Sequence, residues 1–152
     1  RGGAAMPFEP YGYDERQFNS PGFRLPVGRI TRTPNGQYPE YHTSADDLGL
    51  ISGERLVASL DLCRALVEGL EQNRTYRNLQ PFGEPQLGRR GLYRAVGGVN
   101  TTDRQLAMFW ILNQSDGTRD LLQIAERAGL PFDVVAAVAG DLREASLLAA
   151  VD

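Results

Sequence analysis

The sequence has no apolar run approaching the roughly 18 residues that a helix needs to cross a bilayer, so we expect no membrane-spanning segment. Its single cysteine, Cys63, has no partner for an internal disulfide, and nothing indicates an oxidising compartment. We therefore expect a cytoplasmic protein. An excess of positive charge is also lacking, because the net charge is −3 and the isoelectric point is near 5.2. This balance gives no basic footprint for nucleic acid or an anionic membrane.

The first residues lack the marks of a protein's start. Arg1 stands where a methionine is expected, and no apolar stretch of a signal peptide follows it. We interpret the chain as an internal part of a longer protein. What is present is ordinary for a folded protein: 152 residues with 41% hydrophobic and 23% charged residues predict a packed core in one domain or two small ones.

A long amphipathic pattern over residues 48–74 predicts a helix. Ser52 is a suitable N-cap for it, and apolar residues recur at steps of four and three along one face. We expect this face to pack against a core, with Cys63 buried and inert. The face consists of Leu56, Leu60, Cys63, Val67 and Leu70.

The segments around this helix show weaker patterns. Residues 23–30 alternate as in a strand, and Pro26 restricts such a strand to an edge or an end. Residues 78–85 read as a loop, and residues 92–96 as a short strand closed by two glycines. We place a domain boundary near residue 80, which gives domains 1–80 and 81–152.

Three short helical patterns fill residues 101–152. The first begins at Thr102 or Asp103, and the second is capped by Thr118. Because Gly129 and Pro131 suit a tight turn between the second and third, the pair predicts a helix-turn-helix. Residues 147–151 can begin the hairpin that usually follows in a winged helix. The expected buried faces are Leu106, Phe109, Trp110 and Asn113; Leu121, Ile124, Ala125 and Ala128; and Val134, Val135, Val138, Leu142 and Ala145.

The charges of this C-terminal part argue against DNA binding. Residues 93–152 hold five arginines against eight acids, and the expected recognition helix has no lysine. Phosphate contacts dominate DNA affinity, so such a face is repelled by DNA. We expect a packing or dimerisation module instead, with a homodimer as one outcome.

His42 is the single histidine, and it lies in the segment Tyr41-His42-Thr43-Ser44-Ala45-Asp46-Asp47-Leu48. A neutral imidazole is a common zinc ligand, and its second nitrogen usually needs an oriented acceptor. Asp46 and Asp47 are close enough for one to hold the ring while the other caps a helix. The residues alone leave two alternatives open, a metal ligand or an ordinary hydrogen-bonded histidine.

The same segment resembles the one that carries the last zinc-ligand histidine in co-catalytic zinc aminopeptidases and the related glutaminyl cyclases. Upstream, the run from Gly12 to Phe23 resembles the acidic loop that precedes this histidine. The stretch from Tyr11 to Asp47 is most similar to a bacterial aminopeptidase-like family, often encoded near polysaccharide biosynthesis functions, whose members end in a winged helix-turn-helix domain.

This resemblance implies an α/β fold: the C-terminal part of a phosphorylase/hydrolase-like mixed sheet with flanking helices, followed by a small α-rich winged helix-turn-helix domain. It implies one or two zinc ions, which would polarise a scissile carbonyl and lower the pKa of a bound water. It makes His42 the last metal ligand. It places Asp14 in the hydrogen-bond network near the metals and Glu15 and Arg16 along the cleft, with Asp46 and Asp47 nearby.

The chain departs from this family's pattern because it has no second histidine. A catalytic zinc normally takes three protein ligands, so we expect the remaining ligands and the general base to lie upstream of this chain. We assign no catalytic residue within it. Three functions stay open: part of a zinc hydrolase acting on a peptide or aminoacyl substrate and inactive alone, a non-catalytic interaction protein on the same fold, or a DNA-binding regulator.

Overall fold

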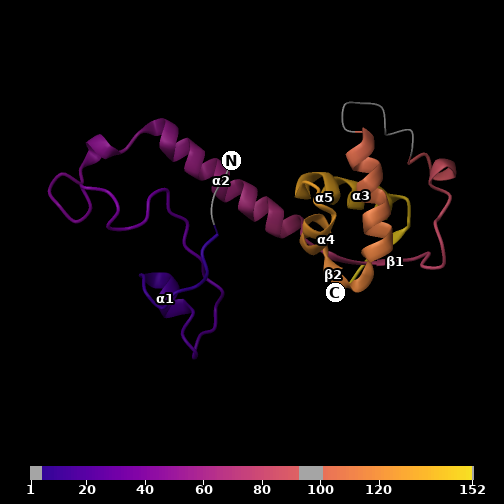
Figure 1. The fold of residues 1–152 in the computed structure, drawn as a ribbon, viewed down its shortest axis with the longest axis horizontal. Coiled ribbons are helices and arrows are strands. Elements are labelled where there is room, and N and C mark those ends of the chain that lie inside the picture. Colours follow the sequence, from indigo (N-terminus) through magenta and orange to yellow (C-terminus); the bar gives the residue numbers. More distant parts are fainter. Residues whose placement is uncertain (1–4, 93–100, 152) are drawn as a thin grey trace. The chain divides into compact units, whose positions relative to one another are not determined.

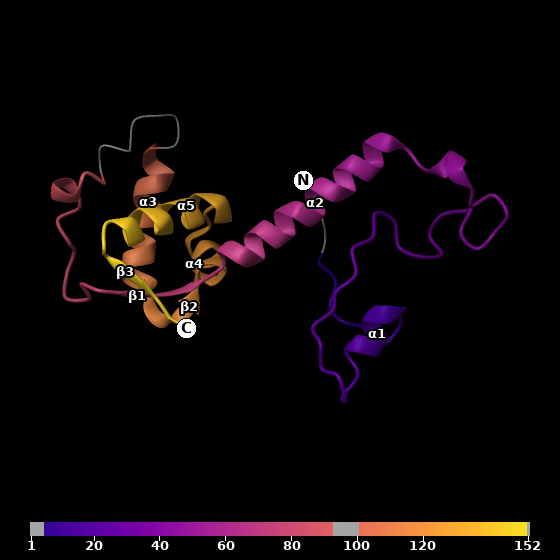
Figure 2. The same cartoon turned by 180° about the vertical axis from the view of Figure 1, so that it is seen from behind.

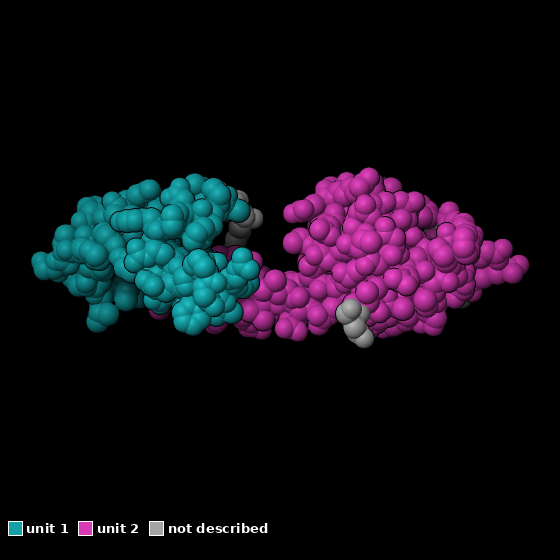
Figure 3. Space-filling model, turned by 90° about the horizontal axis from the view of Figure 1, so that it is seen from below, with its two compact units in different colours: residues 1–52 teal, residues 53–152 magenta. Residues whose placement is uncertain are grey.

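The computed structural model describes residues 5–92 and 101–151. Contacts divide the chain into two compact units, residues 1–52 and residues 53–152, which Figure 3 colours separately. No helix among the described residues is both long and apolar enough to cross a membrane.

Unit 1 consists mainly of turns and irregular segments. Its described part contains the short helix α1, Asp14–Phe18, and the 3-10 helix η1, Leu48–Leu50. The strand predicted for residues 23–30 is wrong, because these residues have no strand assignment. Arg24 adopts a positive φ of 51°, which is outside the extended region, and its amide donates to the Ser20 carbonyl at 2.9 Å. The segment therefore turns where a strand would continue.

The helix predicted for residues 48–74 is confirmed as α2, Gly53–Gln72, which begins directly after Ser52. Its predicted burial is wrong for this chain, because none of its residues is buried and Cys63 is exposed. A periodic apolar face predicts that the face is covered by another surface, but it does not identify that surface. The large exposed apolar side chains of α2 are Leu56, Val57, Leu60, Leu62, Leu66, Val67 and Leu70.

A small antiparallel sheet lies within unit 2. Strand β1, Thr75–Asn78, is central and pairs with β2, Asp116–Asp120, on one side and with β3, Leu148–Ala150, on the other. The sequence did not predict β1, whose Tyr76 and Asn78 face the core while Arg77 faces outward. The strand predicted for residues 92–96 has buried Leu92 at its start, and residues 93–96 lie outside the described part.

Three helices pack beside the sheet (Figures 1 and 2): α3, Thr101–Gln114; α4, Leu121–Ala128; and α5, Phe132–Glu144. The predicted helix-turn-helix is confirmed, since α4 ends at Gly129 with φ 65° and α5 begins after Pro131. The fold class is thus mixed α/β, with a three-stranded antiparallel sheet and a winged helix-turn-helix. A 3-10 helix, η2, Leu87–Arg90, adds buried Leu87 to the core.

Two details of this domain differ from the sequence predictions. The cap of α4 is Asp120 instead of Thr118, because the chain from Asp116 to Asp120 is strand β2 and the helix starts two residues later. The buried face of α3 is rotated from the predicted one: Leu106 and Asn113 are exposed. The buried residues of α3 are Ala107, Met108, Ile111 and Leu112.

The predicted hairpin after α5 starts as expected but pairs differently. Residues 148–150 form β3, and their partner is β1, about 70 residues earlier in the chain. Because β1 bonds to both other strands, the sheet of unit 2 begins at Thr75. The predicted domain limits, 1–80 and 81–152, stay a prediction.

Candidate functional site

His42 lies on an exposed turn of unit 1 with an unusual backbone conformation. Its φ is 58°, a left-handed value that costs a non-glycine residue about 1 kcal/mol or more. Its ring stacks on that of Tyr41, with centroids 4.0 Å apart and planes 13° from parallel. Tyr38 in turn meets Tyr41 edge to face at 5.4 Å. The turn therefore holds the imidazole at the surface against Tyr41, which in turn contacts Tyr38.

The acidic segment that precedes His42 in the chain forms α1. Asp14 and Arg16 are exposed, whereas the Glu15 side chain is 13% exposed and both of its carboxylate oxygens have partners. Its carboxylate pairs with Arg29 at 3.2 Å and accepts from the Tyr13 amide at 3.2 Å. Glu15 therefore stabilises the start of α1, while Asp14 and Arg16 are presented to the outside.

A tyrosine pair joins these two segments of the chain. The hydroxyl groups of Tyr13 and Tyr41 form a short hydrogen bond, which brings the start of α1 beside the His42 turn. This bond is the main reason that the pKa of Tyr41 is raised to about 12, because losing the proton would break it. Sequence reasoning missed both tyrosines. Their positions directly before Asp14 and His42 were the available signal, but hydroxyl pairing across 28 residues leaves no periodic pattern.

The two acids after His42 play different local parts. Asp47 caps η1, its carboxylate accepting from the Gly49 amide at 2.7 Å. This is the capping role expected for one of the pair, although it serves the short helix rather than α2. Asp46 is exposed, and its backbone amide donates to the Thr43 carbonyl at 3.2 Å. The contact recorded for the His42 ring is its stacking on Tyr41, and not a contact with Asp46 or Asp47.

The described residues do not fit a complete zinc site. No group of three or more His, Cys, Asp or Glu side chains in the described part of the chain is arranged to hold a metal ion. A closed or catalytic zinc site needs at least three such ligands. His42 can supply one ligand, and the described residues do not complete a set of three around it.

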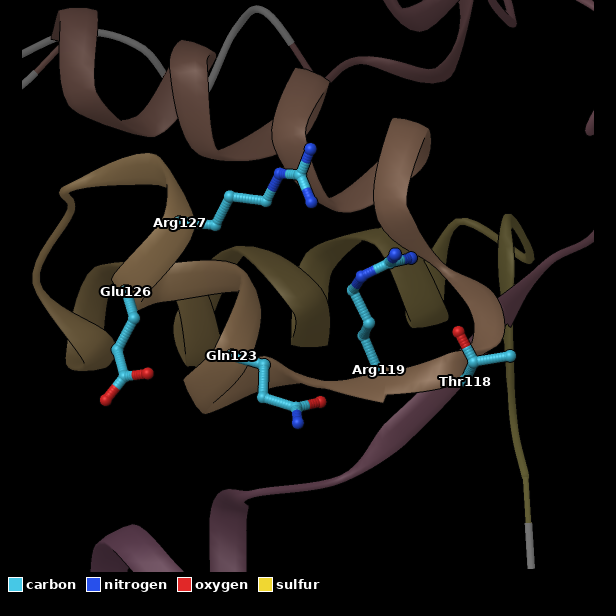
Figure 4. Close-up of a pocket in the computed structure, with 5 residues that line it drawn as sticks. All are labelled: Thr118, Arg119, Gln123, Glu126 and Arg127. Atoms are coloured by element: carbon cyan, nitrogen blue, oxygen red, sulfur yellow. The ribbon is translucent and has the colours of Figure 1, made fainter.

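A shallow hollow on the winged helix is the second place where polar side chains gather. It is lined by residues of β2 and α4, and Gln123 and Glu126 point away from Arg119 and Arg127 (Figure 4). Arg119 pairs with Asp116 at 3.1 Å, so part of its charge is already balanced. Asp141 of α5 forms an ion pair with Arg104 of α3. The exposed charged residues that remain on α5 are Asp133, Arg143 and Glu144. This arrangement offers little attraction to a phosphate backbone.

Comparisons with known proteins divide the chain after α2, at residues 73 and 74, and not at residue 52 as the contacts do. Residues 2–73 match a domain of unknown function (DUF4910), and residues 74–150 match a winged helix-turn-helix. A Clostridium acetobutylicum protein named "Putative polysaccharide biosynthesis protein with aminopeptidase-like domain" is 45% identical over 142 residues, covering 93% of this chain and 32% of its own length.

A solved structure is also similar. The crystal structure of a "putative peptidase" from Clostridium acetobutylicum matches with a TM-score of 0.82 and 42% identity, over 95% of this chain and 31% of that one. The chain thus spans about a third of the length of these relatives. The expected likeness to aminopeptidase-like proteins is confirmed at the level of these names.

The family match over residues 74–150 coincides with the elements already described, since it begins one residue before β1 and ends with β3. Helices α4 and α5, joined at Gly129, form the helix-turn-helix, and the three strands form the sheet beside it. Through these residues, the chain belongs to the winged helix-turn-helix family.

Proposed function

We propose that this chain is part of an aminopeptidase-like zinc hydrolase that acts on an N-terminal aminoacyl or related amide bond. In this proposal His42 is one metal ligand, and the other ligands and the general base come from residues outside the chain. The substrate is a peptide or an aminoacyl small molecule, and the compartment is the cytoplasm. Relatives that are 45% and 42% identical and carry aminopeptidase-like and peptidase names support the assignment.

The observation that carries the proposal is the Tyr13–Tyr41 hydrogen bond. The resemblance concerns two separate segments, the acidic run before residue 23 and the turn at His42, and this bond holds them side by side. The positive φ of His42 adds support, because strained backbone concentrates at functional sites. Asp14 and Arg16 follow Tyr13 closely in the sequence. Both are exposed, so their side chains are available to line a cleft.

The exposed apolar surface supports a larger assembly. Residues 5–75 contain no buried residue, although they carry many large apolar side chains. An ordered segment without buried apolar area lacks the main term that offsets chain entropy. We therefore propose that residues outside this chain complete both the core and the zinc site.

The test is the zinc content and the aminopeptidase activity of the whole protein with His42 replaced. His42→Asn is a sharper variant than His42→Ala, because asparagine tolerates the left-handed conformation and only the imidazole is lost. We expect zinc content and activity to fall together. The matched control is Arg24→Asn, which is also at a positive φ and should leave both unchanged.

The 152-residue chain provides a separate arm of this experiment. We expect it to show no hydrolysis of aminoacyl substrates with added zinc. Hydrolysis by the chain alone would overturn the proposal that the other ligands lie outside it. Zinc content unchanged by His42→Asn in the whole protein would reduce His42 to an ordinary residue of the turn.

A second candidate is a non-catalytic interaction protein. The exposed face of α2 favours it, because such a face suits contact with a second copy or another protein. The same zinc measurement separates the two candidates, since an interaction protein binds no zinc through His42. DNA binding is the weakest candidate, given the acidic surface of α5.

A further inference from the structure

A second hollow, apart from the one in Figure 4, lies between the loop at residues 81–85 and the C-terminal end of α3, within the winged helix domain. It has a volume of about 390 Å³. Its apolar lining comes from Pro81, Pro85, Phe109 and Leu112. This combination suits a ligand with an apolar stem rather than a bare ion.

Buried polar groups lie beside these apolar residues. Asn78 ties the loop to the helix, because its amide donates to the Leu112 carbonyl at 2.8 Å and its oxygen accepts from the Gln80 amide at 2.8 Å. Asn78 is thereby satisfied. Ser115 also lines the hollow and is 3% exposed, yet its hydroxyl has no hydrogen-bond partner among the described residues. An unpartnered buried hydroxyl costs about 1–3 kcal/mol, so this atom lacks the donor or acceptor it needs.

The charges around the hollow are negative. Glu84 lines it, is exposed and makes no ion pair with a described residue. Asp116 lines it as well, with a carboxylate that accepts from Thr118 and pairs with Arg119. The C-terminal end of α3 adds the negative end of a helix dipole. Of its last carbonyl groups, those of Ile111 and Leu112 already accept hydrogen bonds. The hollow therefore favours a cation.

We propose that this hollow binds the basic side chain of a peptide or protein partner, with its alkyl stem against Phe109 and Leu112 and its charged head near Glu84. The winged helix then acts as a peptide-docking module. This agrees with its acidic surface, which attracts basic peptides and repels DNA. The proposal does not depend on zinc or on His42.

The test is a titration of the 152-residue chain with N-acetyl-arginine amide, followed by the amide chemical shifts of unit 2. N-acetyl-citrulline amide is the matched probe, since it has nearly the same shape without the charge. We expect saturable shifts at Glu84, Asn113 and Ser115, and binding of the citrulline probe weaker by about tenfold. Equal binding of the two probes, or no saturable shifts with the arginine probe, would overturn the proposal.

Three variants locate the site. Glu84→Gln should weaken binding of the arginine probe about two- to fivefold, the range of an exposed ion pair. Ser115→Ala should leave thermal stability unchanged or higher, because it removes an unsatisfied hydroxyl, and it should leave binding unchanged, because that hydroxyl is sealed from the hollow. Glu144→Gln removes an equal charge outside the hollow and should leave binding unchanged. If Glu84→Gln binds the arginine probe as tightly as the parent chain, the proposal is overturned.

Discussion

The Tyr13–Tyr41 bond makes the His42 turn sensitive to alkaline pH. Because the pKa of Tyr41 in the folded chain is raised from 10.0 to about 12, the stabilisation is fully present below pH 10 and is lost as pH rises through about 12. We expect Tyr13→Phe to return the pKa of Tyr41 towards 10.0, as followed by the ring-carbon shift of Tyr41 in a pH titration. Tyr38→Phe is the control and should change it little, since Tyr38 is the smallest of the causes. A Tyr41 pKa unchanged by Tyr13→Phe would show that the bond is absent in solution.

The ion pair between Arg104 and Asp141 joins α3 to α5 inside the winged helix. Both side chains are partly buried, and the Arg104 Nε atom has no partner among the described residues. We expect Arg104→Ala to lower the free energy of unfolding by about 1 kcal/mol, measured by urea denaturation. Arg127→Ala, an exposed arginine on α4, should change it by less than about 0.5 kcal/mol. An equal loss in both variants would contradict a specific role for the pair.

For single residues, the sequence identified candidate site residues but did not predict the contacts that they make. His42 stood out because it is the single histidine among acids. Its stacking on Tyr41 and the engagement of Glu15 by Arg29 depend on backbone turns that bring distant residues together. Turns with left-handed residues such as Arg24 and His42 have no hydrophobic period, so their geometry could not be predicted from the pattern of residues.

Among the elements, the helix-turn-helix contains two glycines that allow a matched pair of substitutions. Gly129 ends α4 with φ 65°, a conformation that a side chain strains, whereas Gly140 lies in α5 with no atom near an added Cβ. We expect Gly129→Ala to lower the free energy of unfolding by about 1 kcal/mol and Gly140→Ala to raise it by about 0.5–1 kcal/mol. Thermal unfolding of the two variants gives the sign directly. Effects of the same sign would mean that the αL conformation of residue 129 is wrong.

The N-cap of the short helix α4 is a further feature that substitutions can test. Asp120 and Gln123 form a reciprocal capping box, with the Asp120 carboxylate accepting from the Gln123 amide at 2.8 Å. Asp120→Ala should lower the free energy of unfolding by about 1 kcal/mol. Thr118→Ala tests the cap predicted from the sequence, and it should lower the stability less, because Thr118 lies within β2. The comparison is made by urea denaturation, and a larger loss for Thr118→Ala would restore the sequence prediction.

Helices were predicted well and strands poorly, for physical reasons. In α4 the buried residues Leu121, Ile124 and Ala125 recur at helical spacing, so periodicity identified its buried side. In α3 the run from Leu106 to Leu112 is apolar nearly all round, and periodicity cannot choose a face. Strand β1 has four residues with one large apolar side chain, Tyr76, and its burial depends on pairing with β2 and β3.

For the whole molecule, burial is distributed very unevenly along the sequence. The buried apolar residues all lie between Tyr76 and Leu148, whereas residues 5–75 have none. The first part is also the part that matches the domain of unknown function, and the relatives are about three times longer than this chain. Burial within this chain therefore contributes little to order in the first part.

This unevenness predicts two classes of amide hydrogen exchange in the isolated chain. We expect amides of residues 5–72 to exchange with little protection, because no burial opposes local opening, and amides of α5 and β1 to exchange at least about a thousandfold more slowly. Leu142→Ala, which truncates a fully buried core residue at a cost of about 2–5 kcal/mol, should reduce protection in the winged helix and leave residues 5–72 unchanged. Strong protection of α2 would show instead that its apolar face is covered. If that protection rises with protein concentration, the cover is a second copy of the chain; if it does not, the exposed face described here is wrong.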